Sequence, residues 1–226
     1  MHRNLAIAAA LLTAGCATGP TSYDYTAFRA ENPRSIVVVP VLNQSVNVQA
    51  AENFLSTIAP PFANRGYYVF PSFMVRRSME DDGIGDPGLV HAAPTPRLGE
   101  IFGCDAALYI VIERWESQTI IISTSTTVDL SYELRSCRTG QTIWINRETV
   151  SYSPQASQSG NPLADLVAQA VVSMIEKAAP SYIPLAQQAN LAAATTPGQG
   201  LPLGPYSDDY GQDTDAFPSL TPGQNQ

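Results

Sequence analysis

Few side chains in this chain have the types and spacing that catalysis requires. The chain has two histidines, and only His91 lies beyond its first residues, which excludes metal sites built from several histidines. His91 could act as a general base beside a serine. However, the sequence has neither a Gly-x-Ser-x-Gly turn nor a phosphate-binding glycine loop. We therefore expect no catalytic residue, no metal and no cofactor, and a hydrolase that uses His91 is a weaker alternative.

A second group of polar residues could bind a ligand. Asn43, Ser45 and Asn47 follow the apolar run 35–41, which reads as a buried strand. Open α/β sheets often hold ligands at the carboxyl ends of their strands. The same side chains can also cap the helix that follows. We favour capping and keep a ligand or partner loop as the alternative.

Cys16 has the clearest chemical role because of the segment before it. Arg3 is followed by the apolar run 5–12 and by small residues, which is the order of a secretory signal peptide and too short to span a bilayer. Leu12-Thr13-Ala14-Gly15-Cys16 resembles a bacterial lipobox, where cleavage precedes the cysteine and its thiol carries diacylglycerol. The alternative is an ordinary signal with an accidental cysteine. Ala17 in place of an Asp points, by analogy, to the outer membrane.

Composition and charge set the domain plan. The chain carries a formal charge of −8, and Lys177 is its single lysine, so nucleic acid is not an expected partner. No apolar run after the signal is long enough to span a membrane. We expect a signal peptide at 1–15, a lipidated cysteine and tether at 16–34, one domain at 35–192, and a disordered tail rich in Pro, Gly, Gln and Asp at 193–226.

The periodicities predict an α/β (α+β) fold. We expect strands at 35–41, 67–71, 105–114, 120–134 and 141–152. We expect one helix that begins at residue 50, two helices at 73–81 and 96–102, and a fourth that begins at Asn161-Pro162 and ends at 178. The alternation through 120–134 predicts antiparallel pairing with one covered face. One helix has a continuous apolar stripe, which we expect to cover the sheet: Leu163, Leu166, Val167, Ala170, Val171, Met174, Ile175 and Ala178. The result is a single mixed, largely antiparallel sheet with helices on one face.

Cys104 and Cys137 are the remaining cysteines, in an exported and oxidising compartment. Both lie at the same end of the predicted sheet. A first hairpin centred on Glu116-Ser117-Gln118 would, however, place Cys104 opposite Leu130. A disulfide and two free thiols both stay open.

Several segments also carry a family pattern. They are residues 36–40, Asn43-Gln44-Ser45-Val46, 54–58, 65–71, 102–110, 139–144 and Gly204-Pro205-Tyr206. Together, over roughly residues 23 to 210, they resemble a family of bacterial outer-membrane lipoproteins of unknown function, whose best-known member is a meningococcal surface antigen. The family is similar in fold to the amino-terminal domain of TolB and to the lipoprotein CsgG. The resemblance therefore implies a TolB amino-terminal-domain-like fold, and it supplies no catalytic residues.

The resemblance also bears on function. Genes of this family are typically found beside those of a CsgG-like lipoprotein, which implies a non-enzymatic part in an envelope assembly or transport complex. We expect a lipid-anchored adaptor at the outer membrane, with a CsgG-like lipoprotein among its partners and its domain facing the periplasm or the cell surface. The alternative is a lipoprotein that regulates a periplasmic cell-wall enzyme.

Overall fold

The computed structural model describes residues 23–219. The predicted signal peptide, the predicted lipidation at Cys16 and the last seven residues lie outside the described residues. The helices are α1 (Thr26–Glu31), α2 (Ala50–Asn64), α3 (Ser72–Asp81), α4 (Pro87–Ala92), α5 (Pro96–Phe102), α6 (Pro162–Ala178) and α7 (Tyr182–Thr195). The strands are β1 (Ser35–Val38), β2 (Leu42–Asn43), β3 (Tyr68–Val69), β4 (Ala106–Ile120), β5 (Ser123–Ser136) and β6 (Thr142–Tyr152).

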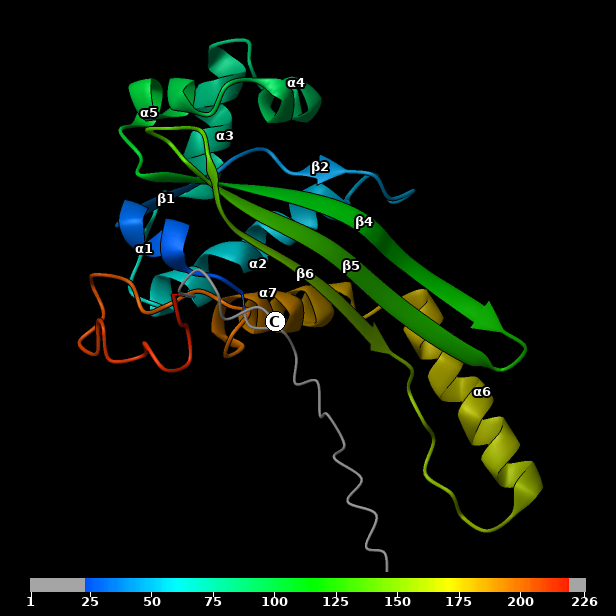
Figure 1. Cartoon of the computed structure of the whole chain (residues 1–226). Coiled ribbons are helices and arrows are strands. Elements are labelled where there is room, and N and C mark those ends of the chain that lie inside the picture. The colour runs from blue at the N-terminus through cyan, green and yellow to red at the C-terminus, as the bar shows by residue number, and fades with distance from the viewer. Residues whose placement is uncertain (1–22, 220–226) are drawn as a thin grey trace, which may run out of the picture.

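The strands form one mixed sheet in the order β3-β1-β4-β5-β6 (Figure 1). β2 continues beside β4 beyond the end of β1. The pairs that involve β1, β2 and β3 are parallel, whereas β4, β5 and β6 form a long antiparallel meander. The predicted α+β fold with a mixed sheet is confirmed.

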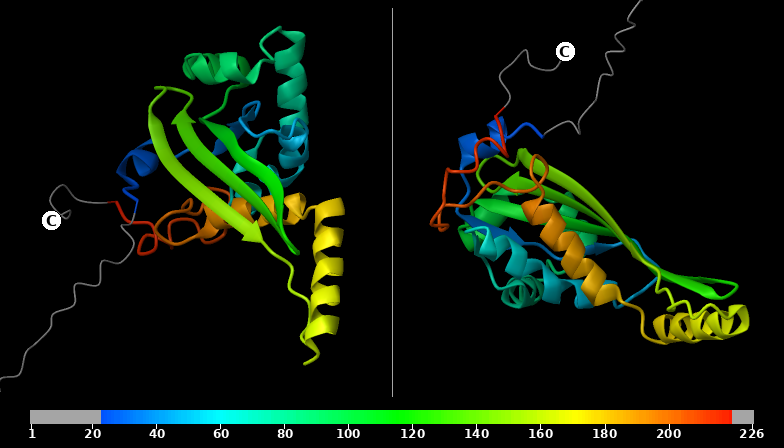
Figure 2. Two further views of the ribbon diagram at one scale, coloured as in Figure 1. Left: turned by 90° about the vertical axis from the view of Figure 1, so that its right-hand side faces the viewer. Right: turned by 90° about the horizontal axis from the view of Figure 1, so that it is seen from below.

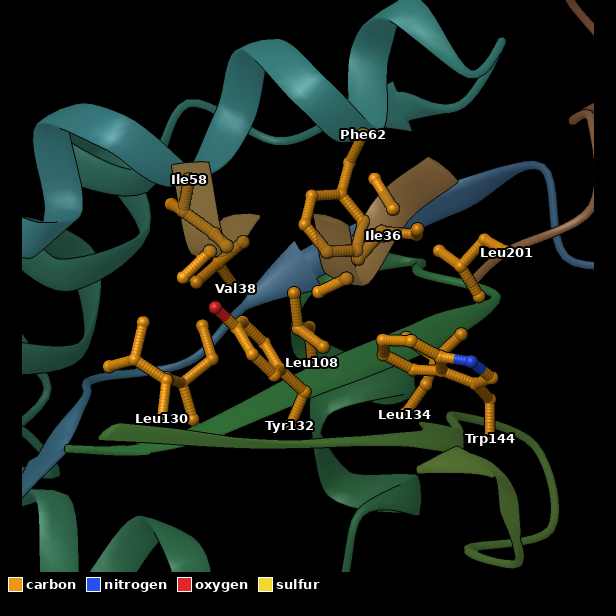
Figure 3. Close-up of a cluster of buried hydrophobic side chains, with 14 of the residues drawn as sticks. Ile36, Val38, Ile58, Phe62, Leu108, Leu130, Tyr132, Leu134, Trp144 and Leu201 are labelled. Carbon is orange, nitrogen blue, oxygen red and sulfur yellow. The ribbon is translucent and has the colours of Figure 1, made fainter. Parts of the chain in front are cut away.

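Helices cover both faces of the sheet at its β1 end, which corrects the expectation of a single covered face. Ile36 and Val38 point toward α2 and α7, and Figure 3 shows this layer closing over the strands. Val37 and Val39 point the other way and pack under α3, α4 and α5. Both faces are covered because β1 and the residue after it are apolar from Ile36 to Val39, as parallel strands buried on both sides are.

The main core lies between the sheet and the pair α2 and α7. Phe62 of α2 meets Trp144 of β6 edge to face, with the ring centroids 6.4 Å apart (Figure 3). α7 was not predicted, because its buried face consists mainly of alanines and shows no strong apolar stripe. Within it, Asn190 accepts a hydrogen bond from the Tyr132 hydroxyl and donates one to Thr57.

The first hairpin turns later than predicted. β4 continues to Ile120 and pairs with Ser123, so the turn lies at Ile121-Ile122 rather than at Glu116-Ser117-Gln118. Polar residues at 116–118 suggested a turn, but they continue the ladder because edge-exposed strand positions tolerate polar side chains. This register brings the start of β4 level with the end of β5.

The domain is wider than the predicted 35–192. Residues 23–34 are not only a tether, since Tyr25 and Phe28 are buried in the core. Most of the predicted disordered tail is ordered too: Leu201 and Phe217 are buried, and the Tyr25 hydroxyl donates to the Gly200 carbonyl at 2.7 Å. Composition alone suggested disorder, but these few apolar residues and the tail's carbonyl groups find partners on the body.

The tail is also held by a glycine contact. Gly66 has a φ of +88°, and a Cβ there would lie 2.5 Å from the backbone nitrogen of Ser207. The amide of Gly204 donates to the Arg65 carbonyl. Two glycines therefore let the tail run against the turn after α2.

Candidate functional site

Helix α6 packs on the sheet through its polar side. Ser173 and Glu176 are its buried residues, and Glu176 is only 5% exposed. The Glu176 carboxylate accepts hydrogen bonds from the Thr126 hydroxyl at 2.5 Å and from the backbone and hydroxyl of Ser181, each at 2.8 Å. We call Ser173, Glu176 and the groups bonded to them the α6 latch.

Ser173 supplies the second half of the α6 latch. Its hydroxyl donates to the Ile122 carbonyl at 2.5 Å, and its carbonyl accepts from the Thr124 hydroxyl at 2.9 Å. Thr124 and Thr126 lie on the face of β5 that is apolar further along the strand. Because the sheet is polar here, it selects the polar side of α6.

The apolar stripe of α6 consequently faces away from the sheet. This corrects the prediction that it covers the sheet. Its large members are exposed: Leu163, Leu166, Val167, Val171, Met174 and Ile175, of which Leu163 is 76% exposed and Val167 63%. The name "α6 stripe" is used below for the eight apolar residues that the sequence analysis assigns to this helix. So many large apolar side chains on one helix face are typical of surfaces that take part in binding.

The tip of the β4–β5 hairpin, at Ile120 and Ile121, lies beside α6 (Figure 2). We call it the hairpin tip. Ile120 is 71% exposed and Ile121 is 93% exposed. Ile121 also has a φ of +57°, which a β-branched side chain rarely adopts. A strained, exposed isoleucine costs the free domain stability of order 1–3 kcal/mol, and such positions tend to occur where function requires them.

His91 is turned toward the fold. Its Nε2 lies 3.1 Å from the Pro40 carbonyl, and its ring meets the Tyr109 ring edge to face at 5.1 Å. Burial lowers the pKa of His91, and the hydrogen bond to Pro40 acts in the opposite direction. Because Nε2 donates a hydrogen bond to the carbonyl, Nδ1 is the ring nitrogen that could accept a proton.

Asn43 ends β2, and Ser45 and Asn47 lie beside it in the loop that leads to α2. The Asn43 carbonyl oxygen accepts from both the amide and the hydroxyl of Ser45, and its amide nitrogen donates to the Asn47 carbonyl at 2.7 Å. Asn47 accepts from the amide of Gln49, the N-cap residue of α2, which has no side-chain cap of its own. These side chains therefore stabilise the conformation of the loop and the N-terminus of α2.

Cys104 and Cys137 meet at the opposite end of the sheet from the hairpin tip. The structure joins them in a disulfide with sulfurs 2.10 Å and Cα atoms 6.0 Å apart. The late turn of the β4–β5 hairpin produces this meeting, because it places Ala106 opposite Ser136. The bond ties the α5–β4 connection to the β5–β6 turn.

Hollows where a small molecule could sit lie in the part of the chain between Tyr23 and Ser219. A cavity of about 200 Å³ lies between α4 and α5, bordered by Leu89, Leu98 and Tyr109, and it is smaller than the roughly 300–1,000 Å³ of usual ligand pockets. A hollow of about 400 Å³ lies beside the disulfide, where Gly99 and Arg138 border it. No three His, Cys, Asp or Glu side chains gather in this part of the chain as a metal site would require. None of its helices has the length and apolar character to cross a bilayer.

Two polar patches in the sequence, considered together, could have indicated how α6 packs. Thr124 and Thr126 interrupt the apolar face of the predicted strand 120–134, and Ser173 and Glu176 lie opposite the α6 stripe. Because the two polar patches have similar lengths, together they predict a polar contact between the helix and the strand. Either patch alone is common in soluble proteins and predicts no such contact.

Comparison with known proteins gives a consistent result. A family model described as "Putative lipoprotein GNA1162-like" matches residues 23–206. The "Putative lipoprotein NMB1124/NMB1162" of Neisseria meningitidis is 33% identical over 172 residues, covering 76% of this chain and 79% of that protein.

Solved structures are similar as well. The crystal structure of lipoprotein GNA1162 from Neisseria meningitidis is 33% identical, covers 64% of this chain and 99% of that chain, and has a TM-score of 0.53. The C-terminal domain of LpoB from Escherichia coli is more distant, at 16% identity over 54% of this chain and 85% of that chain, with a TM-score of 0.35.

Proposed function

We propose that this chain, which belongs to the GNA1162-like family of putative lipoproteins, is a lipid-anchored, non-enzymatic docking protein of the cell envelope. The anchor is the acylated Cys16, and the membrane is the outer one. The protein joins an assembly or transport complex whose other members include a CsgG-like lipoprotein. One observation carries the proposal: the α6 stripe and the hairpin tip expose large apolar side chains that residues 23–219 leave uncovered.

The way in which α6 is held supports this role. A helix that was loosely packed by chance could rotate and bury its stripe, which would gain about 25 cal/mol for every Å² removed from water. The α6 latch opposes that rotation, because turning the helix would break the hydrogen bonds of Ser173 and Glu176 in a buried place. The fold therefore presents the stripe.

The strain at Ile121 supports it independently. Asn or Gly would occupy a φ of +57° at less cost, and a polar side chain would suit a position that is 93% exposed. The isoleucine becomes favourable only when a partner covers it. Natural proteins often accept lower stability for a binding surface.

Capture of partners from envelopes tests the proposal. The full chain would be purified from detergent-solubilised envelopes as wild type and as Val167→Ser/Val171→Ser. The control is Val46→Ser/Val48→Ser, since Val46 and Val48 are exposed valines in the β2–α2 loop. We expect a CsgG-like or other envelope lipoprotein with the wild type and the control, and at least a tenfold loss with the α6 variant.

Two results would contradict the proposal. Equal recovery of the same lipoproteins by all three chains would show that the α6 stripe does not dock them. Direct stimulation of a purified periplasmic cell-wall synthase by the protein, with no lipoprotein partner recovered, would favour the regulator instead. Labelled palmitate that enters the wild type but not Cys16→Ala tests the anchor separately.

A further inference from the structure

We propose that the cavity between α4 and α5 binds one fatty carboxylate, with the alkyl chain inside the cavity and the carboxylate at Arg97. α4 and α5 lie at the other end of the molecule from α6 (Figure 1). The inference therefore goes beyond the proposed function and does not depend on it. The lining of the cavity, its volume and the unpaired charge of Arg97 carry the inference.

The lining of the cavity is apolar in its depth and at its rim. Val90 and Leu98 border it and are buried. Leu89 and Ile101 border it too, but they are 68% and 45% exposed. The cavity therefore opens to solvent on the side of Leu89 and Ile101. Apolar cavities in proteins stay dry and take up apolar ligands.

Tyr109 adds little polar character to the lining. Its hydroxyl shares a hydrogen bond of 2.9 Å with the Thr95 hydroxyl, and the Arg135 guanidinium lies over its ring, 4.2 Å from the centroid. The other residues that border the cavity are aliphatic, with the exception of Arg97. The buried part of a ligand must therefore be hydrocarbon, because a polar group there would find no free side chain with which to form a hydrogen bond.

The volume of the cavity fits a single alkyl chain. The cavity measures about 200 Å³. An engineered apolar cavity of about 150 Å³ in another protein binds benzene, so this one should take about eight carbons of a chain. A medium-length chain would fill it and pass over Leu89 and Ile101 at the rim. A lipid with two chains would leave the second chain in water.

Arg97 supplies the charge that would bind the head group. Most arginines of residues 23–219 form ion pairs with Asp or Glu. Within the same residues, the exposed Arg97 side chain has neither a hydrogen bond nor an ion pair, although Glu100 lies one turn away on α5. Its guanidinium is thus free to bind a carboxylate through two parallel hydrogen bonds.

The number of charges favours a carboxylate over a phosphate head group. Arg97 is the single charged residue among those that border the cavity. A carboxylate brings one negative charge, whereas a phosphate monoester carries about −1.5 to −2 at pH 7. One guanidinium therefore balances the carboxylate and leaves the phosphate with excess charge.

Photo-labelling of the full chain in native membranes tests the inference. The probe is decanoic acid with a diazirine near its last carbon, and the matched probe is decanol with the same diazirine. After irradiation the chain is purified, and mass spectrometry identifies the labelled residues. We expect the label on α4, α5 or Tyr109, and at least a tenfold loss of label in an excess of unlabelled decanoate.

Two variants test the chain and the head group separately. Ala93→Phe places a ring inside the cavity, so it should lower the yield of both probes at least tenfold. Ala93→Leu, a smaller change, should lower both about threefold and serves if Ala93→Phe does not fold. Arg97→Gln should lower the yield of the acid at least tenfold and that of the alcohol less than twofold. Arg34→Gln is the control and should change neither, because Arg34 is also exposed and unpaired within residues 23–219.

Three results would overturn the inference. Equal labelling of the wild type and both Ala93 variants would place the alkyl chain outside the cavity. An equal loss of both probes in Arg97→Gln would show that Arg97 supports the fold and not the head group. Stronger competition by decyl phosphate than by decanoate would identify a phosphate ligand instead of a carboxylate.

The outcomes are also separate from those of the proposed function. The variants at Ala93 and Arg97 leave the α6 stripe and the hairpin tip unchanged, so partner capture should equal that of the wild type. Absent labelling with intact capture would overturn the fatty carboxylate site alone. Labelling as expected, with no envelope lipoprotein captured, would support the site and contradict the adaptor role.

Discussion

α6 and α7 lie against the same β4–β5–β6 meander, yet they turn opposite sides toward it. α7 buries Leu185 and its alanines on apolar strand residues, with Asn190 as a hydrogen-bonded exception. α6 buries Ser173 and Glu176 on threonines and leaves its stripe in solvent. The difference teaches that the strand beneath a helix decides which side is buried, and that amphipathicity alone does not.

The largest expected effect lies at the α7 end. Trp144 is fully buried and donates from Nε1 to the Gln199 carbonyl at 2.8 Å. We expect Trp144→Ala to lower the free energy of unfolding by about 3–5 kcal/mol, measured by urea denaturation. Leu166→Ala on the exposed stripe should change it by less than about 0.5 kcal/mol. Similar losses at both positions would show that α6 is packed like α7.

The disulfide is the next test, and it lies at the end of the sheet opposite the hairpin tip, which we call the closed end. Cys104 and Cys137 are 33 residues apart, and closing a loop of that length is worth about 3–4 kcal/mol. Cys104→Ser/Cys137→Ser should lose that much stability. Nonreducing mass spectrometry should find no free thiol at either position in protein from envelopes, and two free thiols would contradict the bond.

The closed end could be predicted well from the sequence, with some exceptions. The alternating and apolar runs identified β1, β5 and β6, and Asn161-Pro162 located the start of α6. The sequence did not reveal α7, because alanine favours helix without marking a face. The tail was missed because two buried residues in a polar segment, Leu201 and Phe217, do not change its composition.

The candidate site was predicted only in part. The α6 stripe was recognised as apolar, but its partner was taken to be the sheet, because burial within one chain is the usual reason for such a stripe. The hairpin tip was missed because Ile121-Ile122 has none of the Gly, Asn or Asp expected in a two-residue turn. Both errors fall on the same surface, where sequence rules for folding and for binding conflict.

Breaking the α6 latch should have the third-largest effect on the free energy of unfolding. Glu176→Ala leaves the Ser181 amide without its acceptor and the Thr126 hydroxyl with only the longer bond to Ser117, which should cost about 1–3 kcal/mol. The loss should be local, so hydrogen exchange should accelerate in α6, in the first half of β5 and in the first turn of α7, whose N-cap residue is Ser181, and not in the rest of α7. Glu176→Gln keeps an acceptor oxygen and is the control. Equal acceleration in both helices would show that the latch supports the whole domain.

Ile121 gives a smaller effect with the opposite sign. Ile121→Asn should raise the free energy of unfolding by about 1 kcal/mol, because Asn adopts a positive φ more readily. The same change should weaken partner capture, since it removes an exposed apolar group from the docking surface. Ser123→Asn, just after the turn, is the control for surface polarity. A variant that is more stable and captures partners as well as the wild type would remove the tip from the docking surface.

His91 should give the smallest effect, and its sign follows from burial. The folded pKa of His91 lies below the unfolded value, so the unfolded chain binds the proton more readily. Its contribution to stability is therefore present above the unfolded pKa of about 6.5 and is lost as the pH falls toward the folded pKa. His91→Gln should flatten the stability curve in that window, measured by urea denaturation at several pH values.

Because α4 lies at the far end of the sheet from α6, partner capture should not change across the same window. A parallel loss of capture would show that the two ends are coupled, and it would break the comparison between them.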